Sequence, residues 1–486
     1  MREVDVIVVG GGNAGFATAH AARERGRSVA LLERGTHDAG GNSYYTAGAT
    51  RITHDGLEDL LDLVEPDPRH DRTTVPPYSA REYLDDLVKV TDGRTDPELS
   101  RALVDEAADG LRWLRSLGLR YRLMYERQAF ERPDGSYLFW GGLHVGNVGG
   151  GIGLIDDHTR VAKELGATVH YGADVTGFVL DGDRVAGVEY HSDGRTHRLL
   201  AESVVIASGG FEANAALREK YLGPGWGNAK VRGTPHNTGR LLIEAIEVLG
   251  AARGGDWSTC HSVQWDAWHP DNESNRELTN RLTRGGYPLG VIVNRDGRRF
   301  VDEGADFRNY TYARYGRDIL EQPGSVAFQI FDSEVARLLR SEEYQMPGVS
   351  VRSADTIAGL AGQIGVDPGE LSATIGDFNA AIDTGAVFDP NVKDGRRADV
   401  TPPKSNWAVP LRTPPFYAYP VTCGITFTFG GLRAGADTRV LRADGQPIPG
   451  LFVAGEALGG LFSGNYPGGT GLAAGVVFGR RAGGAA

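Results

Sequence analysis

The first 35 residues combine two apolar runs with a helical pattern. Residues 4–9 (VDVIVV) form a continuous apolar run typical of a buried strand, and residues 28–32 (SVALL) form a second. Between them, the small residues Ala14, Ala17 and Ala21 recur on one face of a predicted helix. Strand, helix and strand within about 30 residues indicate a βαβ unit.

The central part of the chain changes pattern twice. Residues 57–125 carry apolar positions at helical spacing, with prolines only between the runs. After Gly166, short alternating runs separated by GDR and SDG turns predict a small antiparallel meander. The meander leads into VVIASGGF at 204–211, which predicts another buried strand followed by a glycine turn.

The strand and helix rhythm fades between about 256 and 423, where tryptophans, arginines and prolines gather. It returns at 451 with LFVAGEALGG and ends in a helical pattern, GLAAGVVFGRRAG. We therefore predict an α/β protein with a discontinuous Rossmann-like domain, residues 1–255 and 424–486. Residues 256–423 are predicted to be a second domain inserted into the first.

Composition and charge exclude several classes of protein. The 486 residues carry a net charge of −12, so no basic surface is expected for nucleic acid. No apolar segment approaches the ~20 residues of a membrane helix. The first strand begins almost at residue 1, which leaves no room for a secretion signal and favours a cytoplasmic protein. Cys260 and Cys423 are predicted to be buried free thiols, and no metal site is expected.

Glycine is the unusual residue, with 69 copies. Gly10, Gly12 and Gly15 form a G-x-G-x-x-G motif after the first strand, and Glu33 ends the second. Such glycines let the backbone approach a pyrophosphate at a helix N-terminus, and the carboxylate can bind a ribose. Glutamate rather than a basic residue at this position favours FAD or NAD over NADP.

Four more glycine clusters lie at both ends of the chain. They are GGNS at 40–43, ASGG at 207–210, AGE at 454–456 and PGGTG at 467–471. An extended dinucleotide along a sheet edge needs such points of close backbone approach. A helix that begins after PGGTG could also stabilise negative charge on a reduced ring.

Four longer segments carry a resemblance to a known family. They are GGNSYYTAGATR at 40–51, RGTPHNTG at 232–239, VNRDGRRFVDEGADFRNYTYA at 293–313 and VFGRRAG at 477–483. Over nearly its whole length the chain resembles the flavoprotein family of fumarate reductases, succinate dehydrogenase flavoprotein subunits, tricarballylate dehydrogenase and 3-ketosteroid dehydrogenases. The local likeness is strongest to the tricarballylate dehydrogenase-like branch.

The resemblance implies that FAD lies across the Rossmann-like domain and that the α+β segment 256–423 caps the flavin. Glu33 would bind the adenosine ribose, Val175 the adenine end through its backbone, and Glu456 the ribitol. The full predicted cofactor set is Gly10, Gly12, Asn13, Ala14, Gly15, Glu33, Arg34, Gly41, Asn42, Ser43, Thr46, Ala47, Gly48, Val175, Ala207, Ser208, Gly209, Gly455, Glu456, Gly469, Thr470, Gly471 and Leu472.

The resemblance also implies a reaction class. Family members oxidise or reduce a CH–CH bond next to a carbonyl or carboxylate, with hydride exchanged at flavin N5 and a proton moved at the neighbouring carbon. Arg308 matches, to within one position of the motif, the arginine that transfers this proton in fumarate reductases. Arg308 could instead only anchor a carboxylate or cap a loop.

The chain departs from the fumarate-reducing relatives at two substrate-binding positions. Thr426 and Phe427 stand where those relatives carry a histidine, and Tyr466 stands where they carry an arginine. Fumarate and succinate are therefore disfavoured as substrates. Tyr466 and a nearby glycine amide resemble the pair with which 3-ketosteroid dehydrogenases hold a ketone oxygen, although Tyr466 could simply pack on the flavin.

His261 lies in an aromatic segment at 256–269 and is a candidate donor to a substrate oxygen. The alternative is a histidine buried in the core. A relay carboxylate is expected near the arginines of LTNRLTRGG at 278–286, but that segment contains Arg281 and Arg284 and no acid. Its absence weakens the proton-transfer role of Arg308.

Non-covalent FAD is expected, because residues 40–53 contain no histidine and His37 is displaced by several positions. The expected partners are a small carbonyl or carboxylate substrate and an unidentified electron donor or acceptor. Three alternatives stay open: a flavin-dependent C–N oxidase, as in the related L-aspartate oxidases, a flavin electron-transfer protein without turnover of its own, and an NAD-only dehydrogenase.

Overall fold

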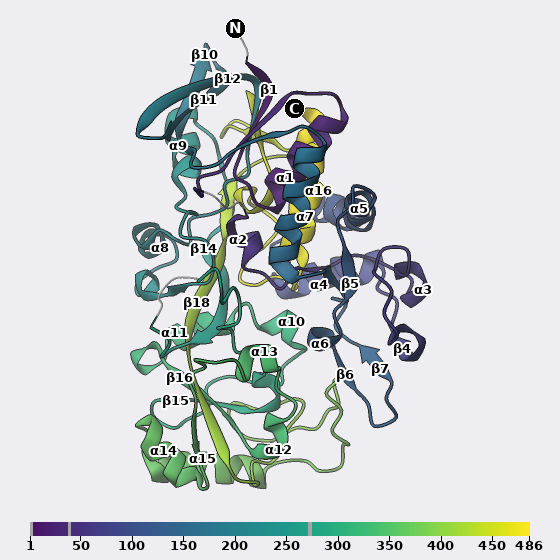
Figure 1. Cartoon of the computed structure of the whole chain (residues 1–486). Helices are drawn as coiled ribbons and strands as arrows, with labels where there is room; N and C mark the ends of the chain where they lie inside the picture. Colours follow the sequence, from purple (N-terminus) through teal and green to yellow (C-terminus); the bar gives the residue numbers. More distant parts are fainter. Residues whose placement is uncertain (1–2, 37–39, 271–274) are drawn as a thin grey trace.

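The computed structural model describes residues 3–36, 40–270 and 275–486. Its largest sheet has a parallel centre in the order β20-β12-β1-β2-β9 (Figure 1). These strands are β1 (Val4–Val9), β2 (Val29–Leu32), β9 (Thr168–His170), β12 (Arg195–Ile206) and β20 (Pro447–Val453). Helix α1 (Asn13–Glu24) connects β1 to β2. The predicted βαβ unit and the α/β fold class are confirmed.

The antiparallel meander predicted after Gly166 is confirmed in part, because its first run, ATVHY at 167–171, is instead strand β9 and pairs in parallel with β2. Its last run differs as well. Strands β10 (Asp174–Asp181), β11 (Arg184–Ser192) and β12 are antiparallel neighbours. The runs THRLLAE and VVI were expected to be separate strands, but both belong to β12. Its first half pairs with β11 and its second half with β1. A single strand therefore joins the meander to the parallel sheet, and it ends at Ile206, before the ASGG turn.

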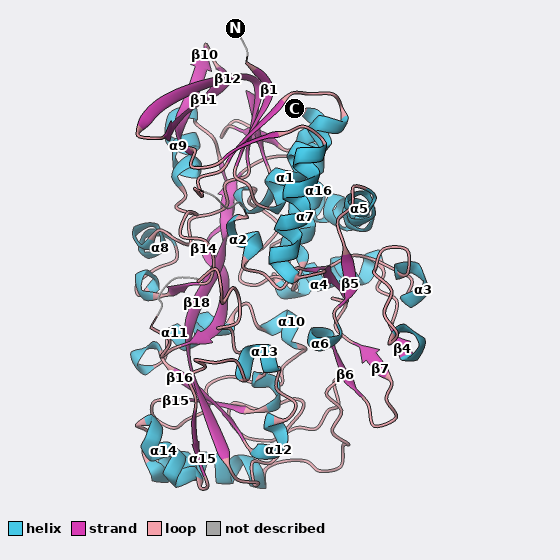
Figure 2. Cartoon of the chain, viewed as in Figure 1, coloured by secondary structure: helices cyan, strands magenta, loops and turns pink. Residues whose placement is uncertain are grey.

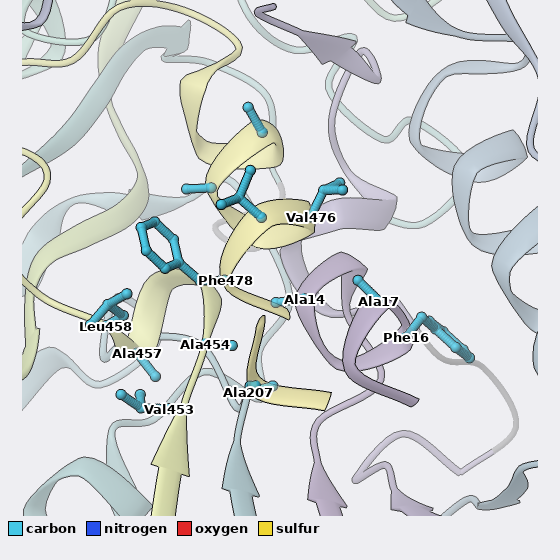
Figure 3. Packing of buried hydrophobic residues seen from close by; sticks show 14 of the residues in the cluster. Ala14, Phe16, Ala17, Ala207, Val453, Ala454, Ala457, Leu458, Val476 and Phe478 are labelled. Atoms are coloured by element: carbon cyan, nitrogen blue, oxygen red, sulfur yellow. The ribbon is translucent and has the colours of Figure 1, made fainter. Parts of the chain in front are cut away.

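Helices from both ends of the chain pack together beside the parallel sheet (Figures 1 and 3). The C-terminal helix α16 (Thr470–Ala485) lies against α1. A Cβ at Gly479 would lie 2.5 Å from the Ala14 carbonyl oxygen, and one at Gly483 would lie 2.1 Å from that of Thr18. Only glycine allows this approach, so the small residues seen in the sequence serve close helix packing.

The segment 57–125 is rich in helix, as predicted. It contains α3 (Leu57–Leu60), α4 (Ala80–Val90) and α5 (Pro97–Ser116). Ser79 forms a capping box with Glu82 at the start of α4, and Asp96 caps α5. Helix α7 (Gly150–Glu164) follows and packs against α1. Around them lie two small sheets, made of β3 (Ala49–Thr50), β5 (Tyr121–Leu123) and β8 (Val145–Asn147), and of β4 (Thr73–Thr74), β6 (Ala129–Glu131) and β7 (Tyr137–Phe139).

A second large sheet occupies the other half of the molecule (Figure 2). It consists of β13 (Lys230–Val231), β14 (Arg253–Asp266), β15 (Val291–Asn294), β16 (Ala327–Phe331), β17 (Arg352–Ala354) and β18 (Phe416–Leu432). Helices α14 (Ile357–Ile364) and α15 (Pro368–Ala380) lie at its far end. The predicted boundaries at 256 and 423 fall inside β14 and β18, which pair with each other along most of their length. The division into two domains stays a prediction.

The remaining elements are short. They are α2 (Gly41–Tyr44), α6 (Tyr125–Gln128), α8 (Ala215–Tyr221), α9 (Arg240–Leu249), α10 (Arg308–Thr311), α11 (Tyr315–Leu320), α12 (Ser333–Ala336), α13 (Ser341–Tyr344) and β19 (Arg439–Leu441). Cys260 and Cys423 are buried free thiols, as predicted. Among the described residues, no helix is both long and apolar enough to cross a membrane.

Candidate active site

One continuous cavity extends from the carboxyl ends of β1 and β2 into the second sheet. Of the predicted cofactor residues, all but Gly15, Gly48 and Thr470 line it, and so do Arg308, Tyr466 and His261. Gly15 and Gly48 have packing roles instead. A Cβ at Gly15 would lie 1.9 Å from the Gly10 carbonyl oxygen, and one at Gly48 would lie 2.8 Å from the Gly150 backbone. Thr470 is fully buried at the start of α16.

The loop after β1 is built around Gly10 and Glu33. Gly10 has φ +105°, and a Cβ there would lie 2.4 Å from the Ala207 carbonyl oxygen. The Glu33 carboxylate accepts hydrogen bonds from the Gly11 N–H at 2.8 Å and the Gly35 N–H at 2.7 Å. Burial raises the pKa of Glu33, and these two N–H groups oppose the increase. Glu33 was predicted to bind a ribose. In the structure it also holds the loop after β1 in shape through these two hydrogen bonds.

Asn13 connects the two ends of the chain at the cavity. Its backbone N–H donates to the Ser43 hydroxyl at 3.1 Å, and its amide donates to the Leu472 carbonyl oxygen at 2.8 Å. Because α1 begins after Gly12 and α16 begins after Gly469, two helix N-termini meet the same cavity. Their partial positive charges favour an anionic ligand group there.

A buried carboxyl pair lies beside these loops. Glu456 accepts from the Thr428 N–H at 2.8 Å, and Glu212 accepts from the amides of Asn42 and Asn237 at 2.5 and 2.6 Å. Burial raises the pKa of both carboxyls, and the mutual contact raises that of Glu456 further. Burial and their proximity thus make each carboxyl harder to ionise while the other is charged. Glu212 directly follows the ASGGF segment, but the sequence pattern did not identify it.

An aromatic chamber forms the part of the cavity next to α16. The His261 ring lies 4.8 Å from the Tyr466 ring, 4.9 Å from Tyr312 and 5.1 Å from Phe427, measured between centroids. The Tyr466 and Tyr312 hydroxyls are hydrogen-bonded to each other. Burial raises the pKa of Tyr466. The neighbouring Tyr312 raises this pKa further, whereas the Gly469 N–H lowers it. Tyr466 is therefore a neutral phenol with a glycine amide at its hydroxyl.

His261 is buried, and neither ring nitrogen has a partner. Burial lowers the pKa of His261 well below its usual value, and the nearby Arg232 guanidinium lowers it further. The ring is consequently a neutral imidazole. It offers one donor and one acceptor to the cavity that it lines.

Arg308 begins α10 and faces the cavity from the second sheet. Its NH1 lies 3.8 Å from the Glu343 carboxylate, and its Nε is buried without a partner. Glu343 also contacts Arg127 at 2.8 Å and Arg340 at 3.3 Å. Burial alone would raise the pKa of Glu343, but the three guanidiniums outweigh it and hold the value at about 2.

Glu343 is the carboxylate that the segment 278–286 lacks. It comes from α13, and its Oε2 accepts from the Gly285 N–H at 2.9 Å, so it reaches that segment through space. The sequence did not single out Glu343, Arg127, Arg232 or Tyr312, although all but Glu343 line the cavity. No local motif marks them, because they come from separate elements. His37 lies outside the described residues.

The cavity fits an extended dinucleotide such as FAD. Its wall at the first sheet is rich in glycine, contributed by Gly10, Gly11, Gly12, Gly209, Gly455, Gly469, Gly471 and Gly475. Gly41 also lines the cavity, and a Cβ there would meet no atom within 4 Å. A ligand can therefore lie directly against the main chain at this point.

Three known proteins illustrate what the chain is similar to. It is 28% identical to the probable fumarate reductase Ifc3 of Shewanella frigidimarina over 490 residues, covering 98% of this chain and 74% of that protein. It is 29% identical to the 4-oxocyclohexanecarboxylate 2-dehydrogenase of Sinomonas cyclohexanicum, covering 96% and 89%. It shares the fold of the 3-ketosteroid delta1-dehydrogenase of Sterolibacterium denitrificans, with a TM-score of 0.75, 21% identity and coverage of 99% and 98%.

The chain spans about half the length of two other relatives that it matches. The expected class is confirmed: an FAD-dependent oxidoreductase acting on a CH–CH bond next to a carbonyl or carboxylate. The likeness to the tricarballylate dehydrogenase branch stays a prediction.

The sequence profile of the FAD binding domain family matches residues 5–472, nearly the whole chain. This range includes every residue that lines the cavity except Ala474 and Gly475. The chain therefore belongs to the FAD binding domain family.

Proposed function

We propose that the protein binds FAD non-covalently in the cavity and interconverts a saturated ketone with its α,β-unsaturated form. The observation that carries this proposal is the position of Tyr466, which lies with the Gly469 N–H at one wall of the cavity that Arg308 also lines. When bound, the flavin supplies a hydride acceptor or donor at N5. The residues of the chain then have to hold the carbonyl and move one proton.

Tyr466 donates its phenol O–H to the carbonyl oxygen in this proposal, and the Gly469 N–H donates to the Tyr466 oxygen, which strengthens that O–H as a donor. A phenol O–H aimed at the carbonyl oxygen stabilises the negative charge that develops there, which acidifies the neighbouring C–H. The raised pKa of Tyr466 keeps its proton in place for this bond. The Tyr312 hydroxyl is hydrogen-bonded to the Tyr466 hydroxyl and helps to fix its position.

Arg308 moves the proton at the carbon next to the hydride-exchanging one. A guanidinium in water is a poor proton donor because its pKa exceeds ~12. Burial lowers the pKa of Arg308, and Arg127 lowers it further, while Glu343 opposes the change. An ion-pair network contacts Arg308 and consists of Glu343, Arg340 and Arg127. Through this network a proton can return to Arg308, or leave it, after each turnover.

His261 closes the chamber between Tyr466 and Tyr312. As a neutral ring with two unpartnered nitrogens, it can hydrogen-bond a second substrate oxygen or an ordered water. Its role in the proposal is to orient the substrate.

Non-covalent binding is supported by the histidines near the GGNS loop. His54 is bonded to His144 at 2.8 Å and does not line the cavity. The substrate class is supported by the relative that acts on 4-oxocyclohexanecarboxylate, a cyclic ketone. The electron donor or acceptor is unassigned, and a cytoplasmic location remains a prediction.

The test is anaerobic mixing of the purified flavoprotein with 4-oxocyclohexanecarboxylate, followed by flavin absorbance. We expect bleaching of the oxidised flavin with formation of the 2-enone, and reoxidation of the photoreduced enzyme by the 2-enone. Peroxide and imine formation from amines would instead support a C–N oxidase. Absence of any reaction with ketones, enones and unsaturated acids would leave an electron-transfer protein and refute the proposal.

A further inference from the structure

A group of unpartnered donors lines the cavity beyond the aromatic chamber. Gln264 is 3% exposed, Asn280 9% and Arg284 1%, and all three face the cavity. Gln264 Nε2, Asn280 Nδ2 and Arg284 Nε are buried and have no hydrogen-bond partner. A buried donor without a partner is unfavourable, so a ligand that accepts hydrogen bonds from these groups is stabilised there.

The direction of the Gln264 amide is set by a chain of hydrogen bonds that starts at a backbone N–H. Gly286 N–H donates to the Tyr344 hydroxyl at 2.7 Å, and Tyr344 donates to Gln329 Oε1 at 2.7 Å. Gln329 Nε2 then donates to the Arg284 carbonyl oxygen at 2.8 Å and to Gln264 Oε1 at 2.6 Å.

Because a backbone N–H can only donate and a carbonyl oxygen can only accept, no amide in this chain can be reversed. Gln264 therefore turns its NH2 group toward the cavity. The ligand that it meets must be a hydrogen-bond acceptor.

The surrounding charges favour an acceptor that is negative. Four guanidiniums line this part of the cavity, those of Arg127, Arg232, Arg284 and Arg308. Three carboxylates pair with them: Asp266, bonded to Arg284 at 2.6 Å, Glu342, which pairs with Arg127, and Glu343, which is shared among Arg127, Arg308 and the nearby Arg340. Arg232 bonds only the neutral Thr426 hydroxyl among its described partners, at 3.1 Å, and its Nε is free. The excess positive charge is buried, and an anionic ligand would neutralise it.

We propose that Gln264, Asn280 and Arg284 form a distal subsite for a carboxylate of the substrate. This inference rests on the proposed function, since it places a second group of the same substrate. Gln264 lies three residues beyond His261 on β14, and the bulge between His261 and Ser262 lets both residues line the cavity, at most about 10 Å apart along the strand. The substrate is thus a keto acid, with the ketone at Tyr466 and the carboxylate at the far end of a ring or short chain.

The experiment measures ligand binding to the holoenzyme through perturbation of the flavin spectrum, and so does not need turnover. The probes are 4-hydroxybenzoate, whose phenol can replace the ketone at Tyr466, and its methyl ester, which lacks the negative charge. The variants are Gln264→Glu, which replaces the donor with a negative acceptor, and Gln264→Leu. Gln363→Glu is the matched control, because it adds the same charge at an exposed amide on α14.

We expect the wild type to bind the acid at least ~10-fold more tightly than the ester. Gln264→Glu should weaken binding of the acid ~10- to 100-fold and binding of the ester less than ~3-fold. Gln264→Leu should bind the acid with an affinity between those of the wild type and Gln264→Glu. Gln363→Glu should bind both ligands as the wild type does. Equal binding of acid and ester by the wild type, no binding of either, or equal losses for both ligands in the Gln264 variants would overturn the subsite.

The two proposals fail separately. If ketones do not reduce the flavin but the acid still binds through Gln264, the reaction is wrong and the carboxylate subsite stands. If 4-oxocyclohexanecarboxylate and its methyl ester reduce the flavin with equal affinity, the reaction stands and the subsite is refuted.

Discussion

The two ends of the cavity are built by different means. At the first sheet the wall is rich in glycine where the backbone must approach, and Glu33 and Asn13 fix the loops. At the second sheet the wall consists of buried side chains, four of them guanidiniums, and these pair with carboxylates that do not themselves line the cavity. A substitution at the first sheet therefore acts through steric clashes and backbone strain. A substitution at the second sheet acts through charge and hydrogen bonding.

The largest effect is expected at the backbone end, from Gly10→Ala. The substitution combines φ +105° with a Cβ 2.4 Å from a carbonyl oxygen, so the loop must move away from Ala207. We expect loss of bound FAD, measured as flavin content after purification. Gly26→Ala is the control, because Gly26 also has positive φ (+77°) but its Cβ would meet nothing within 4 Å. It should keep its flavin and lose only about 1 kcal/mol of stability. Equal flavin content in both variants would contradict the steric role of Gly10.

Arg308→Ala tests the charged end and should retain FAD while turnover falls ~10²- to 10⁴-fold. The measurement is single-turnover flavin reduction together with the flavin content of the purified variant. Arg314→Ala removes a half-exposed arginine outside the cavity and should leave the rate within ~2-fold. Unchanged turnover in Arg308→Ala would exclude this residue from the mechanism.

Tyr466→Phe should lower the rate of flavin reduction by ketones ~10²-fold, because the phenol donor to the developing oxyanion is lost. The ring remains packed against His261 and Phe427, so folding and flavin content should change little. Tyr419→Phe removes the hydroxyl of another buried tyrosine, in β18 and outside the cavity, and serves as the control. A similar rate loss in both variants would indicate a general effect of removing tyrosine hydroxyls rather than carbonyl activation.

This contrast also explains how much the sequence could predict. The backbone end was found from local patterns, since Gly10, Gly12 and Glu33 have a required spacing around one strand and one helix. At the charged end the sequence predicted single residues, Arg308 and Tyr466 from family motifs and His261 from an aromatic segment. Glu343 and Gln264 were not found, because their roles arise from contacts between α13, β14 and the segment at 278–286. Such contacts leave no fixed spacing in the chain.

The smallest effect is expected from pH, through Glu343. Its pKa in the folded protein is about 2, below the ordinary glutamate value, so its ionised form stabilises the fold. This stabilisation is complete above the ordinary pKa of about 4.3 and is lost as the pH falls toward 2.

The free energy of unfolding of the wild type, measured with denaturant, should therefore fall between pH 5 and pH 2. About 1–3 kcal/mol of this decrease should be absent in Glu343→Gln. Glu343→Gln should also be less stable at pH 7, because three guanidiniums then surround a neutral amide. Glu342→Gln is the matched control, since its half-exposed carboxylate pairs with Arg127 at the surface. If both variants retain the acid dependence of the wild type, Glu343 does not carry the charge that organises this end of the cavity.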